Sequence, residues 1–562
     1  MKRLGLLLVL IGVVVLVVGA IVASEVLTAS AAPPAPQLAQ AHRTPPEGAT
    51  YVGSTTCFGC HSSHYRNWDT TLHPRMIQDA AANPAAVLAD FSAGADVRQV
   101  EIAGATREWT LDDVALTMGS KYRQRYIMQM DDGTYMVLPG QWNVRSQTWV
   151  SASPTANWLQ GCGGCHTTGF EAETLTYSEL SVGCEACHGP GSVHVEMANA
   201  LAPDVNPLSE DVYAVRQSIV ATVDSAVCGQ CHTRGTTPDG TFSFPVNYVV
   251  GGPLDETMFV PVAPTGQADD ASFWPDGTER RHRQQYITFM QSGHGSRTLA
   301  QIQDVPYGRD YCMACHSTDY ALQDRTFAQD IVTRETAQFN ITCVHCHSPH
   351  GEAHIEDQLA QDSYQLCISC HTGTSLGERP IQVGAEVHHA MREMYEGISF
   401  LRLPASPSPH FSNEARGPVC ASCHMPGTAA SADQGDIGTH TFHIVFPDEA
   451  APGQPDSCSG CHSLARNPEN TPENLTASIR TVQDNTRTRI ERLRADLEEI
   501  IEENPEWANI TDAAAKSADQ LRAERIGTLI SFVEADGSWG FHNPGYTNII
   551  LTEAERLMDE MP

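Results

Sequence analysis

Residues 343–347 read CVHCH, two cysteines two residues apart with a histidine directly after the second, and this short pattern decides the fold. The pattern C-x-x-C-H occurs nine times in the 562 residues and uses all 18 cysteines. Such a segment is the attachment signal of c-type haem: the two thiols bond to the porphyrin and the histidine ligates the iron from one side. The sequence therefore predicts nine covalently bound haem c groups.

The expected ligands follow directly from the nine segments. The thioether cysteines are Cys57, Cys60, Cys162, Cys165, Cys184, Cys187, Cys228, Cys231, Cys312, Cys315, Cys343, Cys346, Cys367, Cys370, Cys420, Cys423, Cys458 and Cys461. The proximal iron ligands are His61, His166, His188, His232, His316, His347, His371, His424 and His462.

Other uses of paired cysteines explain the pattern less well. Exported chains pair thiols as disulfides, and C-x-x-C pairs also hold zinc or act as redox dithiols. None of these uses requires a histidine after every second cysteine. Haem attachment is therefore the interpretation that we carry forward.

Composition excludes one class of partner. Lys and Arg number 34 against 67 Asp and Glu, which gives a formal net charge of −33. Nucleic-acid binding needs clustered cations, so it is not expected. Redox partner proteins are the expected partners, and a basic one suits this acidity.

The N-terminus predicts export. Lys2 and Arg3 precede an apolar run over residues 4–23, long enough to cross a bilayer as a helix. Residues 1–31 are therefore a membrane anchor or a signal peptide cleaved near Ala29-Ser30-Ala31, and both place the remainder on the periplasmic or extracytoplasmic side. Residues 32–50 are rich in Pro and Ala and read as a linker.

The rest of the chain divides into three parts. Residues 51–311 carry four haem segments, residues 312–465 carry five, and residues 466–562 have the periodicity of a helical bundle. We expect a mainly α fold with much irregular loop, organised around the haems. Strand-like composition at 98–103 and 122–138, with Asp132-Gly133 as a turn, predicts a small β insert at about 98–145.

Three long helices are expected at the C-terminus. The first starts at Thr471-Pro472, the second covers about 511–533 and the third about 547–558. A shorter helix is expected near 281–291.

Histidine is abundant enough to fill the second axial position of most irons. Of 24 histidines, nine belong to the haem segments, which leaves 15 for other roles. Haem with two histidine ligands suits electron transfer, whereas an iron with one open position can bind a small ligand. The distal candidates that we select here and below are His73, His194, His294, His350, His389, His410, His440 and His542.

The first four segments resemble the tetrahaem cytochrome c554 family. CFGCHSSHYRNWDTTLHPRM at 57–76 is followed by CGGCHTTGF, VGCEACHGPGSVH and CGQCHTRG in that family's order. The resemblance implies that His73 and His194 are distal ligands. It also implies that the haem on Cys162, Cys165 and His166 has an open iron.

From Cys312 onward the chain resembles the nitrite reductase and hydroxylamine oxidoreductase superfamily. HCHSPHG at His345, CASCHMP at Cys420, HTFHI at His440, CSGCH at Cys458 and the terminal helices carry the resemblance. It implies His350, His410 and His440 as distal ligands, with His294 and His542 as further candidates. The pentahaem nitrite reductases use a C-x-x-C-K segment for the active haem, and this chain has none.

Three functions fit these features. The first is a membrane-tethered, exported cytochrome that passes electrons along a chain of mostly bis-histidine haems. The second is an oxidoreductase acting on nitrite, hydroxylamine or tetrathionate at one open haem. Arg123, Arg125 and Arg234 could attract such an anion, although solvated or structural arginines are the ordinary expectation. The third is a subunit of a haem filament, and the oligomeric state stays open.

Overall fold

The computed structural model describes residues 44–562 apart from 255–257, 307, 354, 374–380, 386, 400, 412–418, 429–436 and 511. The expected anchor or signal at 1–31 and most of the linker at 32–50 lie outside the described residues. Among the helices of the described part, none combines the length and apolar composition needed to cross a membrane.

Short helices joined by irregular loops make up the region of the C-x-x-C-H segments. They are α2 (Ser54–Phe58), α3 (Ser62–Trp68), α4 (Gly164–His166), α5 (Glu185–His188), α6 (Ser192–Ala200), α7 (Glu210–Gln217), α8 (Ala226–Gly229), α9 (Gln285–Gln291), α10 (Gly293–Arg297), α11 (Ala300–Gln303), α12 (Met313–His316), α13 (Thr318–Ala321), α14 (Cys343–Cys346), α15 (Ser363–Ile368), α16 (Met391–Glu396) and α17 (Cys420–His424). The helix expected near 281–291 is α9, and it starts four residues later because Arg283 has a left-handed backbone.

An antiparallel sheet forms most of the β structure. Its strands are β1 (Ile77–Asp79), β4 (Leu116–Met118), β5 (Arg123–Gln129), β6 (Tyr135–Val137), β7 (Gln141–Asn143) and β8 (Thr148–Val150), in the order β1-β4-β5-β7-β8 with β6 also paired to β5. Two-stranded pairs add β2 (Gln99–Ile102) with β3 (Ala105–Glu108), β9 (Thr167–Thr168) with β10 (Glu179–Leu180), β11 (Gly235–Thr236) with β12 (Val260–Pro261), and β13 (Gly427–Thr428) with β14 (Ile437–Gly438).

The hairpin expected around Asp132-Gly133 is present as β5 and β6. Gly133 has a φ of 84°, a conformation that glycine adopts without strain, and Ile127 lies opposite Val137 across the pair. The strand expected at 98–103 is β2. The sheet extends beyond the expected insert on both sides, because β1 and β8 add strands of three residues each.

Three long helices close the C-terminus: α18 (Pro472–Glu503), α19 (Ala518–Asp536) and α20 (Pro544–Met558). The hydroxyl of Thr471 caps α18 by accepting the backbone N–H of Asn474 at 3.2 Å. The second helix was expected from about 511 but begins at Ala518, because Ser517 caps it there and single helical turns occupy the preceding residues.

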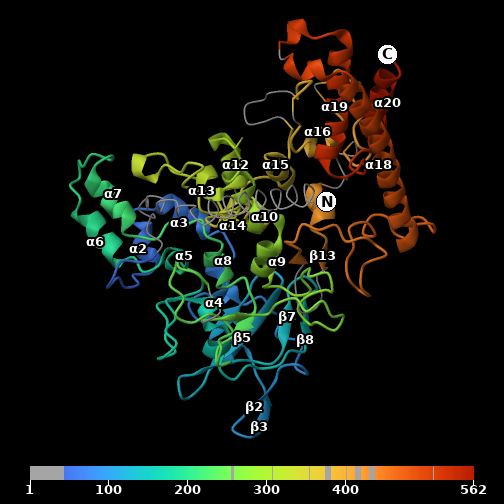
Figure 1. Ribbon diagram of the computed structural model, residues 1–562. Coiled ribbons are helices and arrows are strands. Elements are labelled where there is room, and N and C mark those ends of the chain that lie inside the picture. Colours follow the sequence, from blue (N-terminus) through green and yellow to red (C-terminus); the bar gives the residue numbers. More distant parts are fainter. Residues whose placement is uncertain are drawn as a thin grey trace, which may run out of the picture.

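Apolar cores lie at the two ends of the molecule rather than in its middle. Figure 1 shows the sheet at one end and the three long helices at the other, with the short helices between them. The helical end buries a cluster of 19 apolar residues, whereas the described clusters around residues 165–244 and 302–337 hold three each. Other buried apolar side chains of the middle, such as Phe259, Phe273 and Phe289, lie outside these clusters, so the described middle has no single large apolar core of its own.

Candidate haem sites

The nine C-x-x-C-H segments are numbered here as sites 1 to 9 in chain order: residues 57–61, 162–166, 184–188, 228–232, 312–316, 343–347, 367–371, 420–424 and 458–462. Each of them folds as a single helical turn. At site 1 the backbone N–H of His61 donates to the carbonyl of Cys57 at 2.8 Å, and the equivalent bond is 2.8 Å at site 4 and 2.9 Å at site 9. One turn places residues three apart on the same face, so both thiols point to the same side.

The thiols themselves are available for attachment. All 18 cysteines are free, so the disulfide alternative does not hold. Among the described residues, the groups arranged to bind a metal ion consist of histidines with or without a glutamate, and no cluster of cysteines is among them. The donor set of paired thiols beside a histidine therefore fits haem better than zinc.

Histidine rings face one another at most of the sites. Metal–imidazole bonds are about 2 Å long, so two histidines that share one metal have ring centroids about 6 Å apart. Pairs at that separation include His61 with His194 at 6.2 Å, His188 with His350 at 5.9 Å, His347 with His440 at 6.4 Å, His371 with His294 at 5.8 Å, His424 with His542 at 6.1 Å, and His462 with His410 at 6.1 Å. His61 also lies 6.4 Å from His64.

Hydrogen bonds orient these rings. Nδ1 of His188 lies 2.7 Å from the carbonyl oxygen of Val220, Nδ1 of His194 lies 2.9 Å from that of Val215, and Nδ1 of His347 lies 2.9 Å from that of Asp357. A backbone carbonyl can only accept, so each Nδ1 carries the proton and each Nε2 is left with a lone pair. Histidines that bind a metal through Nε2 are oriented in this way.

His542 differs because its partner is a carboxylate. Nδ1 of His542 lies 2.6 Å from Asp536, whose side chain is fully buried. Burial lowers the pKa of His542, but the charge and hydrogen bond of Asp536 outweigh this effect and raise it overall. If His542 and His424 held a haem iron, this carboxylate would make His542 the more electron-donating of the two imidazoles.

Site 5 has two candidate partners instead of one. His316 lies 6.3 Å from His388 and 6.3 Å from His389, measured between ring centroids. Ligand atoms of the three histidines all lie within 4.8 Å of one another. His389 also lies 5.7 Å from His371 of site 7. His389 was selected as a candidate from the sequence. The sequence offered no reason to prefer it to the adjacent His388.

Site 4 is close to the remaining distal candidate. Burial and then the nearby charges of His73 and His347 lower the pKa of His232 to about 4. Because His347 faces His440, His73 is the candidate that we carry forward as the second ligand of site 4.

Site 2 is surrounded by arginines. In the part of the chain that the structure describes, no histidine ring faces His166, and its buried Nδ1 has no hydrogen-bond partner. Burial, followed by the charges of Arg283 and Arg123, lowers the pKa of His166 to about 4. No motif in the sequence pointed to Arg283, which a turn beside α9 brings to this site.

The arginines converge on His282. Arg123 lies 2.9 Å from its Nε2, and the Nε of Arg234 donates to its backbone carbonyl at 2.8 Å. Burial and then the charges of Arg283, Arg281 and Arg123 lower the pKa of Arg234 to about 10. Of the expected solvated or structural roles, Arg123 and Arg234 fit the structural one, because both are half-buried beside a haem segment and bonded to His282.

Arg125 fits the structural alternative. Its guanidinium donates to the carbonyls of Leu138 at 3.1 Å and Ser153 at 2.6 Å, so it ties the sheet to the loop that leads to site 2.

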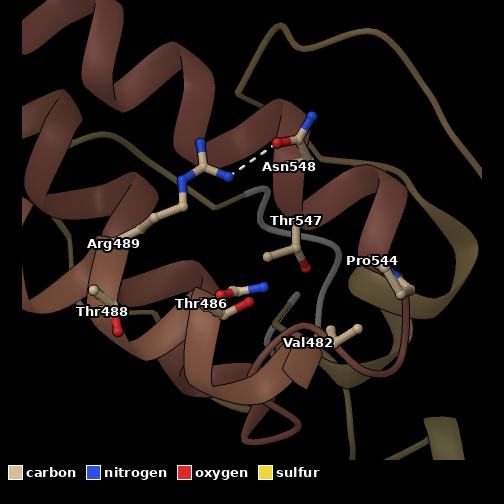
Figure 2. Close-up of a pocket in the computed structure, with 8 residues that line it drawn as sticks. Val482, Thr486, Thr488, Arg489, Pro544, Thr547 and Asn548 are labelled. Atoms are coloured by element: carbon tan, nitrogen blue, oxygen red, sulfur yellow. Dashed lines mark hydrogen bonds between the residues drawn. The ribbon is translucent and has the colours of Figure 1, made fainter. Parts of the chain in front are cut away.

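A pocket on the C-terminal helices lies apart from this chemistry. Its volume is about 480 Å³, and residues of α18 and α20 line it, among them Thr486, Arg489 and Thr547. Figure 2 shows Arg489 donating to Asn548 across its rim, at 2.9 Å. None of the lining residues is a cysteine, histidine or carboxylate, so the pocket adds no redox site.

Family models match three parts of the chain. A model of cytochrome c552 matches residues 406–560, a model of the doubled CXXCH motif matches 337–376, and a model of cytochrome c554 and c-prime matches 139–189. No curated protein matches the chain.

Solved structures match nearly the whole chain. The outer cell wall cytochrome OcwA is 28% identical, with 90% of this chain and 99% of that chain covered and a TM-score of 0.73. An undecahaem cytochrome from the S-layer of Carboxydothermus ferrireducens is 21% identical, with 92% and 70% covered and a TM-score of 0.56. An octahaem sulfite reductase from Wolinella succinogenes is 16% identical, with 92% and 84% covered and a TM-score of 0.42.

The fold and the repeated segments make this chain a multihaem c-type cytochrome. It resembles the cytochrome c554 family in its N-terminal half and the cytochrome c552 family in its C-terminal half, as the sequence predicted. Covalent haem c and electron transfer between several haems follow from that class.

Proposed function

We propose that the protein is an electron-transfer cytochrome with nine haems, eight of which have two histidine ligands. The observation that carries this proposal is the set of facing histidine rings at sites 1, 3, 5, 6, 7, 8 and 9, together with the nearness of His73 to site 4. When bound, the haems supply reversible one-electron chemistry. The chain's own residues attach and orient them and exclude water from between them.

Site 2 is the exception in this proposal. His166 is its single protein ligand, which leaves one axial position for water or a small molecule.

Two measurements on the purified holoprotein test the haem count and the ligands. Mass spectrometry under denaturing conditions should find nine covalent haems, and EPR should find one high-spin iron beside eight low-spin ones. His194→Ala should add a second high-spin iron, while Glu196→Gln, on the same helix but exposed, should leave the spectrum unchanged. Two or more high-spin irons in the unaltered protein would contradict the ligand assignment.

We also propose that the haem domain lies outside the cytoplasm and that the apolar run at 4–23 tethers it to the membrane. The motivation is that run and the similarity to an outer cell wall cytochrome. A tethered protein should sediment with membranes and dissolve in detergent but not in high salt. Release of the protein by salt alone would contradict the tether. A mature N-terminus near residue 32 would show that residues 1–31 are a cleaved signal peptide.

A second candidate function is favoured by the arginines around site 2. Arg123, Arg234 and Arg283 lie around site 2, where no histidine ring of the described chain faces His166. Cations next to an open iron would attract a small oxyanion, and the haem would exchange electrons with it. Under this proposal the protein reduces or oxidises nitrite, hydroxylamine or tetrathionate.

Ligand binding and turnover test the second function separately. Nitrite should shift the absorption spectrum of the single high-spin haem, and Arg234→Gln should weaken that binding by about tenfold, as expected for losing a charge-assisted hydrogen bond. Arg487→Gln, on the exposed side of α18, is the control and should have no effect. If none of the three compounds binds or is turned over in a dye-coupled assay, the enzymatic function is excluded and electron transfer remains the proposed function.

A further inference from the structure

Two histidines and a glutamate form a cluster on the surface beside sites 1 and 3. Nδ1 of His64 lies 3.2 Å from Oε1 of Glu352, and Nδ1 of His350 lies 3.1 Å from the same oxygen. A ligand atom of each residue lies within 4.8 Å of those of the other two. One carboxylate oxygen therefore faces two imidazole nitrogens.

Distant parts of the chain supply this cluster. His64 belongs to α3, and Glu352 follows a turn at Gly351, whose φ of 75° suits glycine. A Cβ at Gly351 would lie 2.7 Å from the side chain of Thr71 and 3.3 Å from the backbone carbonyl oxygen of Asn67, so the turn packs closely on the end of α3. This close approach lets Glu352 reach a histidine 288 residues away.

Ser348 orients the carboxylate of Glu352. Its hydroxyl donates to Oε2, which leaves Oε1 to face the two histidines. A hydrogen bond of this kind fixes the direction of a carboxylate that ligates a metal. The oxygen is therefore in place before an ion arrives.

The spacing matches that of ligands around a small metal ion. Zinc binds histidine nitrogen and carboxylate oxygen at about 2.0–2.2 Å in a tetrahedral arrangement, so neighbouring ligand atoms are about 3.3–3.5 Å apart. The two nitrogen–oxygen distances of 3.2 and 3.1 Å are close to this spacing. Two imidazoles and a carboxylate also suit divalent transition metals, whereas Mg²⁺ and Ca²⁺ are bound by oxygen.

Solvent can deliver an ion to this cluster. The side chains of His64, Glu352 and His350 are 56%, 41% and 38% exposed. A chain of net charge −33 also concentrates cations near its surface. The cluster therefore combines donor atoms at ligand spacing with a path for entry.

The proposed haem ligation does not use His64. His194 and His64 both lie near His61, at 6.2 and 6.4 Å between ring centroids. His194 is the proposed iron ligand of site 1, and its Nδ1 lies 2.9 Å from the carbonyl oxygen of Val215. Nδ1 of His64 faces a carboxylate at the surface instead.

We propose that His64, His350 and Glu352 bind one divalent transition-metal ion, and that Zn²⁺ fits best. Water supplies the fourth ligand. When the ion binds, the proton on Nδ1 of His350 passes to solvent, and His64 keeps its proton on Nε2.

The metal site shares His350 with the haem proposed at site 3. The ring of His350 faces that of His188 at 5.9 Å, with 14° between their planes. An ion on Nδ1 draws electron density from the imidazole and adds positive charge, so it should raise the midpoint potential of this haem. This coupling rests on the proposed function, whereas metal binding itself does not.

Isothermal titration calorimetry of the chelator-treated holoprotein with Zn²⁺ tests the site. The unaltered protein should bind one ion tightly, and His64→Ala and Glu352→Gln should each weaken that binding by at least about tenfold. His443→Ala and Glu502→Gln replace exposed residues of the same types elsewhere and should keep the original affinity. Equal affinities in the cluster variants and their controls would overturn the site.

Two further measurements separate the ion from the haems. His64→Ala should keep the EPR spectrum of the unaltered protein, and an added high-spin iron would make His64 an iron ligand and overturn the metal site. Zn²⁺ should raise the midpoint potential of one low-spin haem in the unaltered protein but not in His64→Ala. Unchanged potentials at saturating Zn²⁺ would overturn the participation of His350.

The metal site and electron transfer fail in different experiments. If the dithionite-reduced holoprotein is not reoxidised by ferricyanide, electron transfer is disproved. If it is reoxidised but Zn²⁺ binding does not depend on His64 and Glu352, electron transfer stands and the metal site is disproved.

Discussion

At the scale of single residues, two adjacent histidines face one proximal histidine at site 5. Either His388 or His389 can supply the second ligand, because both rings lie 6.3 Å from that of His316. We therefore expect His388→Ala and His389→Ala each to keep the iron low-spin. The double variant should add one high-spin iron to the EPR spectrum. A high-spin iron in either single variant would show that one of the two is the sole ligand.

Asp536 should set the potential of the haem at site 8. Its carboxylate accepts the Nδ1 proton of His542 at 2.6 Å, which increases the electron donation of that imidazole to the iron and stabilises the oxidised state. Asp536→Asn should raise the midpoint potential of one haem in a spectroscopic redox titration. The control is Asp484→Asn, an exposed position on α18. If the midpoint potentials of Asp536→Asn equal those of the unaltered protein, His542 is not a ligand of the iron at site 8.

The arginines around site 2 show what single-residue reasoning from sequence misses. Arg123 and His282 are 159 positions apart, yet they are hydrogen-bonded. Such a contact depends on how the sheet packs on the loop before α9. No local pattern of charged residues in the sequence predicts it. Most of the selected distal histidines lie with their rings near a proximal histidine, and their role as ligands stays a prediction. Their partners lie too far along the chain to be assigned by spacing.

At the scale of elements, one carboxylate fastens the start of the described chain to site 3. Glu185 in α5 is buried and accepts the backbone N–H groups of Val52 at 3.0 Å, Gly53 at 2.8 Å and Gly191 at 2.7 Å. Glu185→Gln replaces one acceptor oxygen by a donor that faces another N–H. We expect the free energy of unfolding to fall by about 1–3 kcal/mol, the cost of a buried unsatisfied polar group.

Thermal unfolding followed by circular dichroism measures that change. Glu196→Gln on the exposed side of α6 is the matched control and should unfold at the original temperature. If Glu185→Gln unfolds at the same temperature as the control, water replaces the lost hydrogen bonds and the predicted loss of stability is wrong.

Elements long enough to repeat a pattern were predicted, and short ones were not. The start of α18 at Thr471-Pro472 and the hairpin of β5 and β6 were located from sequence. Strands β1, β7 and β8 have three residues each, too few to show alternation, and pairing with neighbours specifies them instead. The start of α19 was misplaced because the apolar pattern continues into turns that precede its cap.

At the scale of the whole molecule, the middle depends on haem for its core. The helices α18 to α20 and the sheet carry their own large buried clusters, whereas the buried apolar side chains described near sites 4 to 7 form only small clusters. Protein made without haem attachment should therefore be cut by a protease between about residues 160 and 470, while fragments containing the sheet or the C-terminal helices persist. Uniform resistance to the protease would show that the chain folds without its haems.

The ring pair of His61 and His194 has a consequence for how the molecule is made. A chain that crosses a membrane from its N-terminus presents site 1 first, yet the histidine that faces His61 emerges only with α6, after sites 2 and 3 have followed. Under the proposed export and ligation, the first haem to be attached would therefore lack its second ligand until residue 194 arrives. We therefore expect slower export to prolong the time during which this first haem is exposed to solvent.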